Sequence, residues 1–191
     1  SAILASVLVR PSGTASPLTL LALAAGLATV QALDAVVPGR ATLKWPNDVL
    51  VDGHKLAGLL TQVAPTGEVV TGIGLNVSQT AAELPTPQAT SLATLDRPPN
   101  QVDRTGLATG LLRAYAAVYQ LWALDPAGLL AAISARLGTL GQVVRASQPD
   151  GTTQTGRASR LLPDGALELA LPGGQITVLR AGQVEHLRPA P

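Results

Sequence analysis

The sequence contains no cysteine, no phenylalanine and no methionine, and it has only two histidines. The absence of cysteine excludes disulfide bonds, thiolate nucleophiles and cysteine-ligated zinc. His54 and His186 are scattered along the chain and fit neither a metal-ligand spacing nor a Ser-His-Asp triad. We therefore expect no metal that is held by protein side chains alone.

Charged residues are also scarce, at 13% of the 191 residues, and thirteen basic against twelve acidic side chains leave a net charge of +1. This balance provides no basic stripe, so DNA binding is not supported. Hydrophobic residues make up 47%, which is enough for a substantial core. The length suits one medium domain with a small appendage.

Residues 17–37, "PLTLLALAAGLATVQALDAVV", form an apolar stretch that contains Thr19, Thr29, Gln31 and Asp34. Its unbroken apolar part is too short to cross about 30 Å of hydrocarbon. We predict a buried helix over 16–37, stopped by Pro38-Gly39. No secretory signal is visible, so we expect a cytoplasmic protein without membrane contact. The chain begins inside a strand-like run, which suggests that further residues precede it.

The first half of the chain otherwise has a β-strand texture. Asp52-Gly53 is a strong hairpin signal, and Pro65-Thr66-Gly67 marks a second turn. Residues 78–101 are proline-rich with little periodicity, so we predict a long loop. The predicted strands are 1–11 (buried), 41–45, 48–51, 55–63 and 68–77.

Two helices and a second β region follow. Asp103 is a candidate cap for a helix over 104–124, and Asp125-Pro126 opens another that ends near Leu137-Gly138. From residue 139 onward, short strands alternate with Asp-Gly and Pro-Gly-Gly turns. This pattern predicts a small SH3-like β-barrel. We thus expect an α/β body over 1–138 and a separate unit over 139–191.

Polar residues gather in the stretch "LKWPNDVLVDGHKLAG" (43–58). Lys44 and Lys55 could be solvated hairpin charges, and Asn47-Asp48 could be an ordinary turn. Taken together, they could also converge on one anionic ligand, such as a phosphate or acyl-phosphate. No acid–base pair is obvious, which suits a reaction driven by positioning and electrostatics.

Glycines interrupt the two strands that follow. Gly58, Gly72 and Gly74 mark either tight strand packing or close approach of a ligand to the backbone, and the residues alone leave both open. The "GxG" pattern does not lead into a helix, unlike a dinucleotide loop. Strict alternation predicts two opposite faces in the strand after the hairpin, with Lys55, Ala57 and Leu59 on one and Leu56, Gly58 and Leu60 on the other.

Four segments in order, "KWPNDV" (44–49), "KLAGLL" (55–60), "GIGLNV" (72–77) and "ATSL" (89–92), resemble the biotin protein ligases, the biotin–[acetyl-CoA-carboxylase] ligases. The resemblance covers essentially the whole chain, because "GALELAL…ITVLRAGQVEHLR" is similar to the small C-terminal β-domain of that family. It implies a class II aminoacyl-tRNA synthetase-like fold, with a mixed β-sheet flanked by helices, followed by the SH3-like domain.

The resemblance also implies an activity. Members of the family join biotin to ATP, giving biotinyl-5′-AMP and pyrophosphate, and then transfer biotin to one lysine of a biotin carboxyl carrier protein of acetyl-CoA carboxylase. ATP, Mg²⁺ bound through the nucleotide phosphates, and biotin would be the small-molecule partners. A homodimer is possible.

Site residues follow from the same resemblance. Lys55 would hold the biotin carboxylate and the α-phosphate, and Asp48 would either orient the incoming lysine amine or serve the structure. The biotin slot would be lined by Lys55, Gly58, Leu60, Gly72 and Gly74, and the ATP side by Lys44, Asn47 and Asn76.

The family's Gly/Arg-rich loop, expected just upstream of the first strand, is not within this sequence. Two rival interpretations are a lipoate or octanoate ligase or transferase of the same fold, and a non-enzymatic binding module. Transferases of the lipoate group use a cysteine, which this chain lacks, and a binding module would show no ligand-linked stability.

Overall fold

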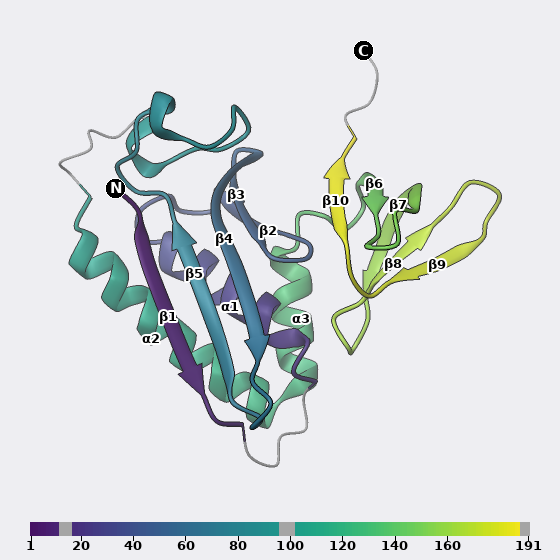
Figure 1. Ribbon diagram of the computed structural model, residues 1–191, viewed down its shortest axis with the longest axis horizontal. Helices are drawn as coiled ribbons and strands as arrows, with labels where there is room; N and C mark the ends of the chain where they lie inside the picture. Colours follow the sequence, from purple (N-terminus) through teal and green to yellow (C-terminus); the bar gives the residue numbers. More distant parts are fainter. Residues whose placement is uncertain (12–16, 96–101, 188–191) are drawn as a thin grey trace.

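The computed structural model describes residues 1–11, 17–95 and 102–187. Within these ranges the chain forms two five-stranded antiparallel sheets and three α-helices. The three helices lie against one sheet, and the second sheet extends to the side of that body (Figure 1). The expected α/β architecture is therefore confirmed.

The first sheet has the strand order β1-β5-β4-β3-β2. Asp52 and Gly53, both with positive φ, form the turn between β3 and β4, as the hairpin signal predicted. The strands are β1 (Ile3–Val9), β2 (Ala41–Lys44), β3 (Asp48–Val51), β4 (His54–Val63) and β5 (Val69–Leu75).

The prediction of a mixed sheet is wrong for the described residues. All four strand pairs are antiparallel, and parallel pairing is limited to the isolated bridges Leu43–Leu137 and Lys55–Ala89. Strands β2 to β5 follow one another through short turns, whereas parallel neighbours need a long crossover connection.

The helices are α1 (Leu20–Leu33), α2 (Arg104–Leu124) and α3 (Pro126–Arg136). Residue 16, the predicted start of the first helix, lies outside the described residues, and α1 ends before the predicted residue 37. The other two predictions are confirmed, because the Asp103 and Asp125 carboxylates accept the backbone N–H groups of Gly106 and Gly128, each at 2.9 Å.

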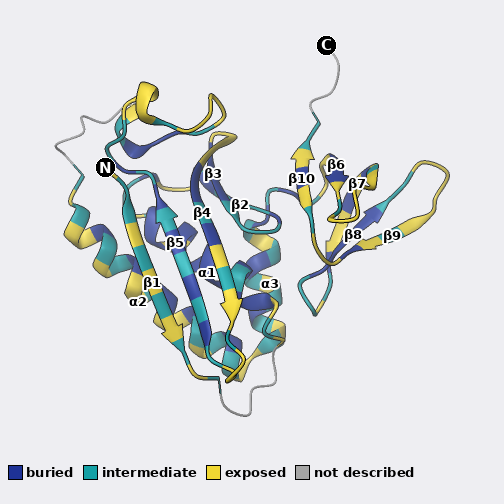
Figure 2. Cartoon of the chain, in the orientation of Figure 1, coloured by how far each residue is buried: buried dark blue, intermediate teal, exposed yellow. Residues whose placement is uncertain are grey.

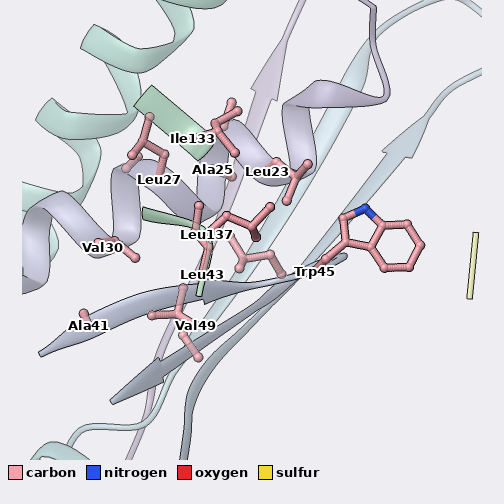
Figure 3. Close-up of a cluster of buried hydrophobic side chains, with 14 of the residues drawn as sticks. Leu23, Ala25, Leu27, Val30, Ala41, Leu43, Trp45, Val49, Ile133 and Leu137 are labelled. Carbon is pink, nitrogen blue, oxygen red and sulfur yellow. The ribbon is translucent and has the colours of Figure 1, made fainter. Parts of the chain in front are cut away.

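Helix α1 is the centre of the core. It is buried on almost every side because it lies between the sheet and the two other helices, which suits its uniformly apolar sequence. Leu23 and Leu27 of α1 face Leu43 and Val49 of the sheet (Figure 3). No helix within the described residues is long and apolar enough to cross a membrane.

The opposite face of the first sheet is open. Strand β1, predicted to be buried, is instead an edge strand whose residues alternate between half-buried and exposed. Leu4 is 82% exposed on this face, and Leu60 of β4 is 61% exposed. Figure 2 shows the exposed residues along β1 and the lower part of β4, in front of the buried α1.

The second sheet has the order β10-β6-β7-β8-β9. A closed barrel would need its outer strands β9 and β10 to pair, and no such pairing occurs within the described residues, so the predicted barrel is not confirmed. The strands are β6 (Val143–Ser147), β7 (Thr153–Leu161), β8 (Leu167–Ala170), β9 (Ile176–Leu179) and β10 (Gln183–His186).

The predicted loop over 78–101 contains two short 3-10 helices, Ala81–Glu83 and Leu92–Thr94. Its last residues, 96–101, lie outside the described part. The backbone of Lys55 makes two hydrogen bonds to this loop. Its N–H donates to the Gln88 carbonyl and its carbonyl accepts from the Thr90 N–H, each at 2.8 Å. The loop thereby flanks the start of β4.

Candidate active site

A β-bulge at the start of β4 changes which way Lys55 points. Val49 of β3 pairs with Ala57, but the next residue, Leu50, pairs with Lys55, so Leu56 has no partner of its own. The extra residue shifts the alternation of β4 by one position. The predicted faces are therefore wrong for Lys55, which lies on the open face with Gly58.

Lys55 is held by a carboxylate. Its Nζ lies 2.5 Å from Oδ1 of Asp48, and Nζ of Lys44 lies 3.8 Å from the other Asp48 oxygen. The Asp48 side chain is 16% exposed, whereas that of Lys55 is 48% exposed. Asp48 thus fixes the inner side of the ammonium group and leaves the rest accessible to a ligand.

Gly58 makes room for this lysine. A Cβ at position 58 would lie 3.2 Å from Cε and 3.3 Å from Nζ of Lys55, tighter than nine in ten Cβ contacts in proteins. The lysine stem therefore crosses the strand over the missing side chain. Among Gly58, Gly72 and Gly74, only Gly58 lies so close to another residue that a side chain there would cause crowding.

The open face carries a hollow of about 450 Å³, which we call the open-face hollow. A Cβ on Gly72 or Gly74 would meet the nearest atoms at 3.7 Å, an ordinary van der Waals distance, so strand packing does not require glycine at either position. At Gly72 and Gly74 the backbone itself lines the hollow, because no side chain covers it. The residues that line it are Leu4, Ala5, Ser6, Asn47, Lys55, Gly58, Leu59, Leu60, Gly72, Ile73 and Gly74.

The turn over residues 44–48 forms one rim of the hollow. The Asn47 side-chain amide donates to the Leu59 carbonyl at 2.6 Å, and the Leu59 N–H donates to the Asn47 carbonyl at 2.9 Å. These two bonds extend the β3–β4 pairing by one residue before Asp48, the first residue of β3. Asn47 is therefore fixed at the rim of the hollow.

Asn76 lies outside the open-face hollow. Its amide N–H donates to the Thr90 carbonyl at 3.0 Å, and its amide oxygen accepts from Gln79 at 2.9 Å. One end of the side chain thus holds the "ATSL" segment, and the other end holds Gln79. Of the predicted site residues, the structure places Asn47, Lys55, Gly58, Leu60, Gly72 and Gly74 around one hollow, with Lys44 and Asp48 adjoining it.

Several residues at the site were not predicted. Leu4 and Ser6 of β1 line the open-face hollow, and a regular alternation of side chains was the only signal for them.

A second hollow of about 270 Å³ lies where the 44–48 turn meets the second sheet, lined by Thr19, Ala22, Leu23, Trp45, Pro46, Asn47, Asp164, Gly165, Ala166 and Arg180.

Two titratable groups of the second sheet lie close to the 44–48 turn or the second hollow, Asp164 and His186. Asp164 is ion-paired with Arg180, and the Ala166 backbone N–H, more than that arginine, lowers the pKa of the Asp164 carboxyl. Burial, with the Lys44 charge as a smaller cause, lowers the pKa of His186 below its usual range. In the described part of the chain, no three His, Asp or Glu side chains are grouped as a metal site.

Comparison with known proteins shows what the whole chain is similar to. The model of the biotin/lipoate A/B protein ligase family matches residues 1–79. The biotin–[acetyl-CoA-carboxylase] ligase of Mycobacterium tuberculosis is 44% identical over 171 residues, which cover 88% of this chain and 62% of that protein. The bifunctional ligase/repressor BirA of Bacillus spizizenii is 31% identical over 122 residues, which cover 60% and 37%. The chain thus spans less than two thirds of these relatives.

Solved structures agree on the fold. The biotin protein ligase of Aquifex aeolicus in complex with biotin and ATP superposes with a TM-score of 0.80 at 24% identity, covering 98% of this chain and 78% of that one. The Helicobacter pylori synthetase with bound biotinylated ATP gives 0.64 at 21% identity, covering 93% and 75%. Sequence similarity and fold thus point the same way: the chain is similar to biotin–[acetyl-CoA-carboxylase] ligases over most of its length, and its fold is that of the solved biotin protein ligases.

Proposed function

We propose that this chain carries the catalytic part of an enzyme that activates biotin with ATP to biotinyl-5′-AMP and transfers biotin to a lysine of a biotin carboxyl carrier protein. One observation supports it most directly. The bulge at Leu56 places Lys55 on the open face, over a hollow floored by three glycines. A fixed cation beside bare backbone suits a ligand with a flat apolar body and an anionic end.

The ring system of biotin would lie on the backbone of Gly72 and Gly74. Neither residue projects a side chain into the open-face hollow, so a fused bicyclic ring can come within van der Waals contact of the strands. Leu4 and Leu60, both exposed, would cover its edges and lose their contact with water on binding. The carboxylate end of biotin would point to Lys55.

Lys55 would act on the first reaction step. A carboxylate oxygen of biotin attacks the α-phosphorus of ATP, the bond to the bridging oxygen breaks, and pyrophosphate leaves. Both reactants are anionic, so an ammonium between them lowers their repulsion and stabilises the charge that develops on the phosphorus. Asp48, at 2.5 Å, would hold this ammonium in place as a positioning residue.

The phosphates would lie toward the 44–48 turn, near Lys44 and Asn47. Mg²⁺ would accompany ATP through its phosphate oxygens, because Asp48 is already committed to Lys55 and Lys44. For Asn76 we propose an indirect role on the nucleotide side, since both ends of its amide already hold other residues.

In the second step, the lysine amine of the carrier protein attacks the acyl carbon of the adenylate and AMP leaves. We propose that residues 139–191 form a separate SH3-like unit beside this site. Five short antiparallel strands with their own buried residues, Val144, Ala146, Leu167, Leu169 and Leu179, support that view.

Biotin-dependent release of pyrophosphate, followed by transfer of labelled biotin to carrier protein, tests the proposal. Lys55→Met should reduce the release by about 100-fold or more. Arg113→Met, which removes an exposed cation from α2, is the control and should have no effect. Release that depends on lipoate and not biotin would overturn the assignment in favour of the related ligases. A melting temperature that neither biotin nor ATP raises would favour a binding module instead.

A further inference from the structure

Trp45 connects the 44–48 turn to the C-terminal part of the chain. It is 2% exposed and lies between Lys44 and Asn47. Its backbone N–H donates to the Thr139 hydroxyl at 3.0 Å, and its indole N–H donates to the Gly165 carbonyl at 2.9 Å. Figure 3 shows the indole extending beyond the cluster of core side chains. Both N–H groups of this residue are thus bonded to residues beyond position 138.

Thr139 is the centre of this connection. It is fully buried, and its hydroxyl oxygen also lies 3.1 Å from Nε2 of His186 at the end of β10. The preceding residue is fixed as well, because the Gly138 N–H donates to the Leu43 carbonyl at 2.9 Å. The segment that joins helix α3 to the second sheet therefore runs beside β2, and its residue Thr139 contacts Trp45.

The Trp45 N–H, the Thr139 hydroxyl and the His186 imidazole can form a chain of two hydrogen bonds. A hydroxyl that accepts the Trp45 N–H still has one proton to donate, and a neutral imidazole offers one nitrogen that accepts it. Burial and the nearby charge of Lys44 favour the neutral ring. His186 can thus orient the hydroxyl of Thr139 so that its lone pair faces Trp45.

We propose that Thr139 and His186 are positioning residues for the nucleotide half of the site. Thr139 bonds directly to the 44–48 turn, and His186, at the end of β10, orients the Thr139 hydroxyl. This inference rests on the proposed function. The turn is fixed on its other side by the bonds between Asn47 and Leu59, so Lys44 and Asn47 are placed by two independent tethers. Loss of one tether would let both side chains move, and shifts of about 1 Å at a reacting group are costly.

Thr139→Val tests the proposal because it keeps the shape of the side chain and removes the hydroxyl. We expect kcat/KM for ATP to fall about 10-fold, the effect typical of one lost buried hydrogen bond, with the KM for biotin unchanged. Thr139→Ser restores the hydroxyl and should recover most of the activity. His186→Ala should lower kcat/KM for ATP in the same direction, and His186→Gln, whose amide oxygen keeps a hydrogen-bond acceptor near the same place, should recover part of it.

Thr29→Val is the matched control. Thr29 is also fully buried, and its hydroxyl donates to the Ala25 carbonyl at 2.8 Å inside helix α1, away from the 44–48 turn. It should leave kcat/KM for ATP unchanged. If Thr139→Val and Thr29→Val affect the kinetics equally, Thr139 has no specific positioning role and the inference is wrong.

A second measurement does not depend on activity. Hydrogen exchange of the Trp45 backbone amide should accelerate in Thr139→Val and in His186→Ala, and stay slow in Thr29→Val. If the unaltered protein shows no biotin-dependent pyrophosphate release, the proposed function fails, whatever the exchange shows. If that release is normal but the Trp45 amide stays protected in Thr139→Val, the positioning inference fails by itself.

Discussion

Gly74 separates the two explanations for the glycines of β5. It pairs with Leu4 on one side and with Gly58 on the other, and a Cβ at this position would lie 3.7 Å from the Leu4 side chain and 3.8 Å from the Gly58 carbonyl. Those are comfortable distances, so the folded protein accepts alanine here. The new methyl group would instead project into the open-face hollow.

The expected effects on stability and on binding have opposite signs. Replacing a strand glycine with alanine should leave the free energy of unfolding unchanged or raise it by up to about 1 kcal/mol. A methyl group forced against a bound ring system should cost about 1–3 kcal/mol of binding energy. That range corresponds to a biotin Kd raised roughly 5- to 150-fold, with Gly74→Val at the upper end or beyond.

Calorimetric titration with biotin and urea unfolding of the same samples measure the two effects. Gly110→Ala is the control, because a Cβ on this α2 residue meets no atom within 4 Å and should change stability without changing biotin affinity. An unchanged biotin Kd in Gly74→Ala, or a clear loss of stability, would refute the reasoning and make this glycine a requirement of strand packing.

Three further predictions concern the lysine, the histidine and the helices. Gly58→Ala should displace the Lys55 side chain and slow pyrophosphate release more than it weakens biotin binding; equal losses in both would contradict this. Burial, and secondarily Lys44, lower the pKa of His186, so this imidazole binds a proton more readily in the unfolded chain than in the folded one. Stability should therefore rise with pH through the region just below the unfolded histidine pKa of about 6.5, and His186→Gln should flatten that rise in urea unfolding at several pH values. Parallel pH profiles of the two proteins would exclude this contribution. Arg136→Met removes the paired bonds to Asp34, at 3.0 and 2.8 Å on partly exposed side chains, and should cost only about 0.5–1 kcal/mol in the same assay; a loss several times larger would show that the pair is more than a surface contact.

Local chemistry determined much of this protein from sequence alone. Asp103 and Asp125 marked the starts of two helices because a carboxylate satisfies the first free N–H groups of a helix wherever the helix packs. Asp52-Gly53 marked a hairpin because its turn needs positive φ at both residues. The family resemblance came from four short segments in a fixed order, so it could be recognised without a structure.

The orientation of Lys55 was decided by the tertiary structure. A period of two assumes regular pairing along β4, but the strand contains an extra residue at Leu56 where it meets β3. Whether a strand bulges depends on its partner, so no pattern within β4 revealed it. The antiparallel order of the sheet and the open face of β1 likewise follow from which strands meet.

The tether of the 44–48 turn also belongs to the tertiary structure. Thr139 lies 94 positions from Trp45, and His186 lies 47 positions from Thr139. Nothing in the local sequence of a threonine or a histidine says which distant backbone group it will meet. The sequence by itself determined most of the helices and strands and the family resemblance. The tertiary structure decided that Thr139, Gly165 and His186 meet at Trp45, because hydrogen bonds of this kind form only between segments that the fold brings together.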